Sequence, residues 1–151
     1  EETDAENLRK LSGEERDVTA PGGVDISSSS NKIEAGEQPL INGDGSQAYD
    51  FIYVEDVARS NIDAAISDTN FGFYNVGTEV QTTIKELCDT ILELKNSPLK
   101  VTYKPYSEDD ARQLVQNRIG SASKAKEEIG FGYKVSLKEG LQKLIDWRDS
   151  Q

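Results

Sequence analysis

The stretch from residue 39 to residue 65 constrains the fold most, because it signals a turn, a strand and a helix in direct succession. Residues 43–45 read Gly-Asp-Gly, which predicts a turn because Asp-Gly tolerates left-handed backbone angles. The side chains from 49 to 54 then alternate in two sets, as in a strand. Asp56 is expected to N-cap a helix over residues 57–66, since its carboxylate can accept unpaired backbone N–H groups.

This helix is expected to bury one apolar stripe against the core. The stripe recurs at helical spacing and consists of Val57, Ala58, Ile62, Ala65 and Ile66. A short buried strand, bounded by turns, is expected next over residues 70–77.

The residue patterns in the second half of the chain predict a strand and three more helices. Thr83 and Glu86 have the spacing of a capping box. The helix behind them presents one apolar face, formed by Ile84, Leu87, Cys88, Ile91 and Leu92. Cys88 on that face is interpreted as a packing thiol and not a nucleophile, since the chain has no histidine to activate it. Residues 99–103 alternate as a strand.

Two helices are expected near the end of the chain. Ser121 or Ser123 caps a short one that runs through residue 128 and ends at Gly130. A second capping box, Ser136 with Glu139, starts the last helix. Its inward stripe is expected to be Leu137, Leu141, Leu144 and Ile145, with Trp147 sealing the end.

The charge balance excludes some classes of partner. Lys and Arg number 17 against 28 Asp and Glu, for a net charge of −11. Nucleic acids and anionic membranes bind clustered cations, so neither is predicted as a partner. A single cysteine allows no internal disulfide, no long apolar run is present, and a cytoplasmic location is expected. Methionine is absent even at position 1, which predicts a fragment, a processed chain or an edited one.

Two regions are expected. Residues 1–35 combine a charged helix with a Gly/Ser-rich, partly disordered loop and a helical turn near residues 31–35. Residues 36–151 form the α/β module. The fold class is therefore α/β, a small two-layer domain of about four short strands and four to five helices.

Several motifs resemble one enzyme family. Residues 36–41 read Gly-Glu-Gln-Pro-Leu-Ile, and residues 43–58 read Gly-Asp-Gly-Ser-Gln-Ala-Tyr-Asp-Phe-Ile-Tyr-Val-Glu-Asp-Val-Ala. Ser-Lys-Ala at 123–125, Ile-Gly-Phe at 129–131 and the Leu-rich helix ending at Trp147 follow. The chain is similar to extended short-chain dehydrogenase/reductases, the UDP-glucose 4-epimerase-like enzymes that epimerise or dehydrate nucleotide sugars with bound NAD. The resemblance covers their C-terminal, substrate-binding part.

The resemblance implies a substrate site. Leu40 and Asn42 would contact the nucleotide base, mostly through backbone groups, and Asp110 or Asp109 would bond the ribose hydroxyls. The family usually places Arg at the position of Tyr49, where a guanidinium would hold the diphosphate. Arg112 and Arg118 are the cations placed to compensate, and Arg118 is the candidate contact. The alternatives are that Tyr49 is a core aromatic, that Arg118 pairs with Glu127 or Glu128, and that the acids 108–110 form a solvated loop.

The parts that perform chemistry in this family have no match in the chain. No Gly-rich phosphate loop is present, so neither a complete Rossmann sheet nor an NAD site is expected. The family's catalytic lysine would fall near Glu2 and its tyrosine before residue 1. The prediction is therefore no catalytic, cofactor-binding or metal-binding residue, and no activity of the chain alone.

Two functional hypotheses remain open. One is an enzyme fragment that binds a nucleotide sugar such as a UDP-sugar. The other is a non-enzymatic scaffold, trimmed or engineered, with no ligand. A third possibility adds a partner: a missing Rossmann half, or self-association through exposed apolar surface.

Overall fold

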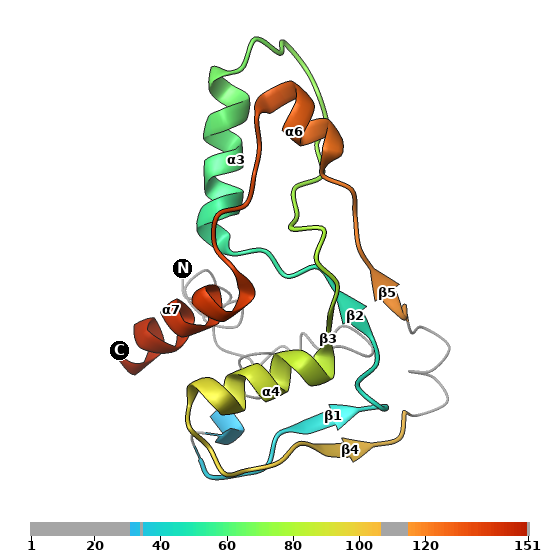
Figure 1. Ribbon diagram of the computed structural model, residues 1–151, viewed down its shortest axis with the longest axis vertical. Coiled ribbons are helices and arrows are strands. Elements are labelled where there is room, and N and C mark those ends of the chain that lie inside the picture. Colours follow the sequence, from blue (N-terminus) through green and yellow to red (C-terminus); the bar gives the residue numbers. More distant parts are fainter. Residues whose placement is uncertain (1–30, 34, 107–114, 151) are drawn as a thin grey trace, which may run out of the picture.

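The computed structural model describes residues 31–33, 35–106 and 115–150. These residues form β1 (Leu40–Asn42), β2 (Ala48–Tyr49), α3 (Val54–Ile66), β3 (Thr82–Thr83), α4 (Ile84–Leu94), β4 (Thr102–Lys104), β5 (Asn117–Arg118), α6 (Ser123–Ile129) and α7 (Leu137–Asp149). The α/β prediction is confirmed. In Figure 1, α3 and α6 lie together at one end of the molecule, and β1 and β4 lie at the other.

The strands form two small sheets. β1 pairs with β4 in parallel, with Leu40 opposite Thr102 and Asn42 opposite Lys104. β2 is the central strand of the second sheet, in the order β3-β2-β5. It runs antiparallel to β3 and parallel to β5. Among the described residues, helix α4 is the element that joins the two sheets, since it follows β3 directly and packs over β1.

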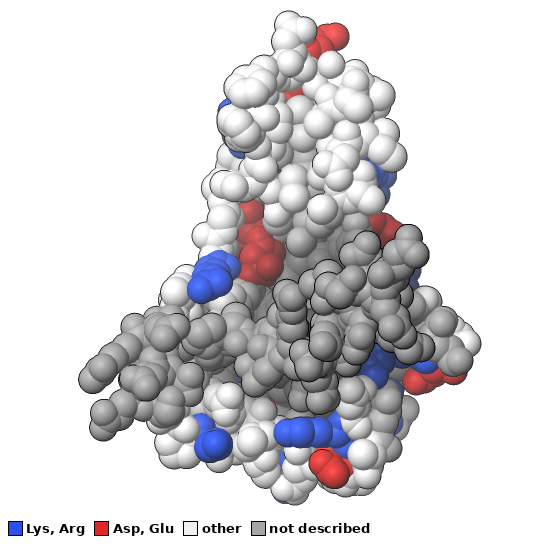
Figure 2. All heavy atoms as spheres, turned by 180° about the vertical axis from the view of Figure 1, so that it is seen from behind, with Lys and Arg blue, Asp and Glu red and all other residues white. Residues whose placement is uncertain are grey.

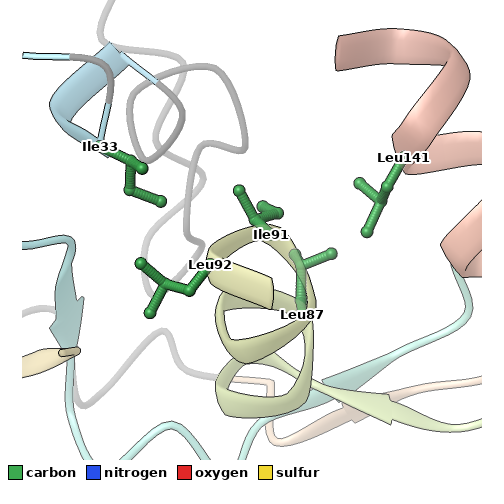
Figure 3. Close-up of a cluster of buried hydrophobic side chains, with 5 residues drawn as sticks. All are labelled: Ile33, Leu87, Ile91, Leu92 and Leu141. Atoms are coloured by element: carbon green, nitrogen blue, oxygen red, sulfur yellow. The ribbon is translucent and has the colours of Figure 1, made fainter. Parts of the chain in front are cut away.

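The core is built around α4. One side of this helix packs Ile84 and Cys88 against Ile41 of β1. Cys88 is fully buried there, as the packing interpretation predicted. The other side faces α7, and Figure 3 shows Leu87 and Ile91 pointing toward Leu141. The helix thus covers a sheet on one side and another helix on the other.

Both predicted capping boxes are confirmed. The Thr83 side chain accepts from the backbone N–H of Glu86, whose carboxylate accepts from the backbone N–H of Thr83. Ser136 and Glu139 do the same at the start of α7. All five predicted apolar residues of α4 are buried: Ile84, Leu87, Cys88, Ile91 and Leu92.

The last two helices differ from prediction in detail. Helix α6 ends at Gly130 in the left-handed region, as expected, but its N-cap is Ala122 and neither serine caps it. Leu141 and Ile145 of α7 are buried, whereas Leu144 is 37% exposed and Trp147 is 60% exposed. Trp147 is therefore too exposed to seal the end of the helix as predicted.

The prediction for α3 is wrong at both its start and its buried face. The helix begins at Val54, three residues early, behind Tyr53 in an extended conformation. Asp56 is not the N-cap, because its carboxylate accepts from the backbone N–H groups of Lys134 and Val135 instead. The buried residues are Asp56 and Ser60. The expected apolar stripe points outward.

Three strand predictions were also too long. The strand expected over 49–54 is limited to Ala48–Tyr49, because the chain leaves the sheet after the backbone N–H of Asp50 donates to Arg118. Residues 70–77 form no strand and none of them is fully buried, with Phe71 79% exposed and Phe73 80% exposed. The strand expected at 99–103 is Thr102–Lys104. Each pairing depends on a partner strand that local alternation does not specify.

Some predictions lie outside the described residues. These are the charged helix and loop before residue 31 and the acids 108–110. Residues 31–33 do form the predicted helical turn, and Ile33 is buried against α4. None of the described helices combines the length and the apolar character needed to cross a bilayer.

Candidate functional site

Tyr49 and Arg118 lie opposite each other on neighbouring parallel strands, β2 and β5. The backbone N–H of Ala48 donates to Gln116 at 2.9 Å and that of Asp50 donates to Arg118 at 3.2 Å, which fixes this register. Neighbouring strands are about 4.8 Å apart, and residues in register point to the same face. Two of the predicted site residues are therefore brought together, although 69 positions separate them.

The Tyr49 ring belongs to the core. It packs against the cluster of Ile41, Ile84 and Cys88, and its ring lies edge-on to Phe51 with the centroids 6.2 Å apart. The core interpretation of Tyr49 is confirmed. The residue remains half-buried, so one part of it still faces the outside of the sheet.

Arg118 is exposed and borders an open cavity of about 520 Å³. The predicted pairing with Glu127 or Glu128 is wrong: the structure has no ion pair between them, and Glu128 accepts a hydrogen bond from the Tyr74 hydroxyl at 2.8 Å. The cavity is lined by Asp50, Tyr74, Asn75, Val76, Gly77, Arg118, Ile119, Gly120, Ser121 and Ala122. The guanidinium is thus available beside a largely polar hollow.

Two acidic residues hold the walls of this cavity, and the sequence analysis did not identify them. The Asp50 carboxylate accepts the backbone N–H groups of Thr78 and Glu79, each at 2.9 Å. Glu79 in turn accepts the backbone N–H of Ala122 at 2.7 Å and the Ser121 hydroxyl at 3.0 Å. Both carboxylates are held by backbone N–H donors, which stabilise their negative charge without removing it.

Glu79 adopts a φ of 60°, in the left-handed region that favours glycine. The strain is balanced by the two hydrogen bonds that its carboxylate accepts.

The predicted base contacts on β1 belong to the β1–β4 sheet, whereas Tyr49 and Arg118 belong to the β3-β2-β5 sheet. Ile41 is fully buried under Tyr49, and alternation along the strand turns Leu40 and Asn42 the other way. Leu40 is 38% exposed. The backbone N–H of Gly43 donates to Lys104 at 2.7 Å. Asp110 lies outside the described residues, so its ribose contact stays a prediction.

Gln47 is a further polar residue that the sequence analysis missed. Its side chain is 1% exposed, and neither amide atom has a hydrogen-bond partner. A buried polar group without a partner costs about 1–3 kcal/mol. It lies two residues before Tyr49, at the start of the strand that carries the candidate site.

The described residues hold no cluster of three or more His, Cys, Asp or Glu side chains that could bind a metal ion. Asp44 near β1 has a pKa below its ordinary value, because the hydroxyl and the backbone N–H of Ser46 both donate to its carboxylate. The Asp44 carboxylate is therefore held by hydrogen bonds within its own turn.

Comparison with known proteins gives concordant matches. The family described as GDP-mannose 4,6 dehydratase matches residues 12–144. A putative UDP-glucose 4-epimerase from Methanocaldococcus jannaschii is 33% identical over 135 residues, which are 89% of this chain and 42% of that protein. UDP-glucuronic acid decarboxylase 3 from Arabidopsis thaliana is 34% identical, over 70% of this chain and 30% of that protein.

Solved structures agree with the sequence matches. The UDP-glucose 4-epimerase of Thermotoga maritima, solved with UDP-glucose, matches with a TM-score of 0.74 and 32% identity, over 86% of this chain and 41% of that one. The UDP-N-acetylglucosamine 4-epimerase of Methanobrevibacter ruminantium, in complex with UDP-N-acetylmuramic acid, matches with a TM-score of 0.75 and 30% identity, over 88% and 41%. A Bacillus cereus UDP-glucuronic acid 4-epimerase in complex with NAD, 20% identical, shares the fold. This chain spans about two-fifths of the length of the two epimerases.

Proposed function

This chain belongs to the GDP-mannose 4,6 dehydratase family, and we propose that it binds a nucleotide sugar, of the UDP-hexose class, without transforming it. It resembles the C-terminal part of NAD-dependent nucleotide-sugar epimerases and dehydratases. The proposed ligand contacts are Leu40 and Asn42 for the base, Tyr49 and Arg118 for the diphosphate, and Asp110 for the ribose.

The position of Arg118 carries this proposal. The related enzymes usually have a diphosphate-binding arginine where this chain has Tyr49. Arg118 lies directly opposite Tyr49 on the adjacent strand, about 4.8 Å away at the backbone. A guanidinium on a long side chain spans that distance easily, so the chain keeps a bidentate phosphate donor at nearly the same place.

The surroundings of Arg118 support an anionic ligand. Asp50 lines the same cavity and Glu79 binds the wall at Ala122, and both carboxylates accept backbone N–H groups. Among the described residues, Arg118 makes no ion pair that a phosphate would have to break.

Calorimetric titration of UDP-glucose, UDP and NAD tests the function. We expect UDP and UDP-glucose to bind with micromolar dissociation constants and NAD not to bind. Arg118→Ala should weaken UDP about tenfold to a hundredfold, because a charge-assisted contact contributes about 1.5–3 kcal/mol. Lys126→Ala is the matched control: it removes an exposed cation from the last turn of α6 and should leave the affinity unchanged.

A separate NAD-binding half would be the partner that this function requires for turnover. The chemistry in these enzymes belongs to the cofactor, and the chain alone is proposed to hold no NAD. Measurable epimerisation or dehydration by the purified chain, or binding of NAD to it, would contradict the proposal.

The second candidate function is a scaffold with no ligand. Tyr49 favours it, because a half-buried tyrosine in the core replaces the arginine that would hold a diphosphate. In that case, calorimetric titration with UDP, UDP-glucose or NAD gives no heat of binding, even at millimolar ligand. The two candidates are therefore separated by one set of measurements on the same preparation.

A further inference from the structure

Hydrogen bonds join the segments beside Arg118 into a closed ring. The backbone N–H of Asp50 donates to the backbone carbonyl of Arg118 at 3.2 Å. The Asp50 carboxylate accepts the backbone N–H groups of Thr78 and Glu79, each at 2.9 Å, and the Thr78 hydroxyl as well. The Glu79 carboxylate accepts the backbone N–H of Ala122 at 2.7 Å. Because Ala122 lies on the same segment as Arg118, the chain itself closes this carboxylate ring.

The ring holds the Arg118 segment at two points. Asp50 fixes it at Arg118, and Glu79 fixes it again at Ala122. Gly120 lies between these points, and a Cβ built there would meet nothing within 4 Å. Since glycine has more backbone freedom than any other residue, packing at position 120 does little to order the segment. The Glu79 carboxylate therefore restricts a part of the chain that would otherwise be loosely held.

The turn that carries Glu79 is itself held against β5. The side chain of Gln81 donates to Oδ1 of Asn117 at 3.2 Å, next to Arg118. Glu79 has a φ of 60°, and a residue at such an angle persists only where the surrounding structure fixes it. Backbone strain of this kind gathers at binding sites and switch regions. Here the strained residue is the one whose side chain contacts the Arg118 segment.

Charge alone would make Glu79 unfavourable for an anionic ligand. Figure 2 shows the molecule from behind, and acidic and basic atoms share its surface near mid-height. A carboxylate close to a phosphate site lowers the local potential and weakens anion binding. A favourable effect of Glu79 on binding therefore has to come from geometry, and the two effects have opposite signs.

We propose that Glu79 is a positioning residue, which holds Arg118 through the carboxylate ring where a phosphate group can meet its guanidinium. The inference rests on the proposed function, because Arg118 is the phosphate contact there. Glu79 acts through the backbone of residues 118–122 and not by contact with the ligand. With that backbone fixed, only the rotamers of the Arg118 side chain remain to be ordered on binding, which lowers the entropic cost.

Amide hydrogen exchange on the full chain, followed by NMR, tests the ring without a ligand. The reporter is the Asp50 amide, which donates to Arg118, and the reference is the Ile84 amide, which donates to Gln47 just before β2. Glu79→Ala should speed exchange of the reporter about fivefold or more relative to the reference, because it removes the bonds that close the ring. A general loss of stability would speed both amides equally and leave the ratio unchanged.

Calorimetric titration with UDP tests the role in binding. Glu79→Ala should weaken UDP about three- to tenfold, although it removes a negative charge. Glu79→Gln removes the same charge but keeps a carbonyl oxygen that can accept the Ala122 N–H, so its affinity should equal or exceed that of wild type. In an Arg118→Ala background, Glu79→Ala should change the affinity by less than about twofold, because the residue that it positions is gone.

Glu128→Ala is the matched control. It removes another exposed carboxylate, which accepts the Tyr74 hydroxyl in the wall of the same cavity at 2.8 Å, and it leaves the carboxylate ring intact. We expect the exchange ratio to stay unchanged in this variant and the UDP affinity not to fall.

An unchanged exchange ratio in Glu79→Ala would overturn the proposal, and so would a UDP affinity that stays the same or rises in that variant. A Glu79→Gln variant that loses as much affinity as Glu79→Ala would also contradict it, because the hydrogen-bond acceptor would then not be what matters. A wild-type chain that does not bind UDP refutes the proposed function and the ligand role of Glu79 with it. The exchange ratio then still decides whether Glu79 holds the Arg118 segment in place.

Discussion

Replacing Asp56 with alanine should cost about 3 kcal/mol of unfolding free energy, because one carboxylate joins α3 to the segment before α7. Its Oδ2 accepts the backbone N–H groups of Lys134 and Val135, each at 3.0 Å, and its Oδ1 pairs with Arg59 at 2.7 Å. Hydrogen bonds to charged groups contribute about 1.5–3 kcal/mol each. Lys134 is exposed and Val135 half-buried, so water compensates part of the loss.

The effect should depend on pH with a definite sign. Burial by itself raises the pKa of Asp56, but the N–H groups of Val135 and Lys134 together with the Arg59 guanidinium outweigh it, and the pKa lies below the ordinary 3.8. The unfolded chain holds the proton more tightly than the folded one. The stabilisation is therefore fully present above the ordinary pKa and is lost as the pH falls through the lowered, folded-state pKa.

Urea denaturation followed by circular dichroism, at pH values stepped from about 7 down to 2, measures both quantities. The gap between wild type and Asp56→Ala should be widest near neutrality and should narrow in acid. Asp63→Ala, on the same helix and half-buried, makes none of these contacts and serves as the control. A loss below about 1 kcal/mol, or a gap that does not change with pH, would refute the reasoning.

Three further substitutions test other parts of the structure. Thr83→Ala should lower stability by about 1 kcal/mol, measured by urea denaturation, because it removes the capping box of α4. Gly77→Ala would place a Cβ 2.4 Å from Oδ2 of Asp50 and should cost about 1–3 kcal/mol, whereas Gly132→Ala meets nothing within 4 Å and should be nearly neutral. Tyr49→Arg should tighten UDP binding about tenfold in calorimetry, since it restores a guanidinium beside Arg118; unchanged or weaker binding would contradict the site.

The features that the sequence predicted correctly are local ones. A capping box spans four residues, so Thr83 with Glu86 and Ser136 with Glu139 could be identified without knowing what packs around them. The left-handed end of α6 at Gly130 is equally local, because glycine alone takes that conformation at no cost. The strands were predicted less well, since each consists of two or three residues that pair across long sequence separations.

In the candidate site, too, the local features were predicted and the long-range contacts were not. The family resemblance pointed to Tyr49 and Arg118 separately, but only the β2–β5 register shows that they are neighbours. Asp50 and Glu79 were missed because their partners are backbone N–H groups about 30 to 40 positions away. Carboxylates of this kind leave no spacing signal in the sequence, since any residue can supply a backbone donor.

Helix α3 shows most clearly what periodicity leaves undetermined. Four of the five predicted stripe residues, Ala58, Ile62, Ala65 and Ile66, share one exposed side of the helix, whereas Val57 is half-buried. It does not say which side the chain itself covers, because that depends on whether the rest of the fold has apolar surface to offer there. In this structure Asp56 anchors the opposite side through Arg59 and the backbone before α7, which leaves the apolar side outward. An exposed apolar stripe and a core stripe therefore have the same sequence signature, and in α3 the buried Asp56 carboxylate decides between them.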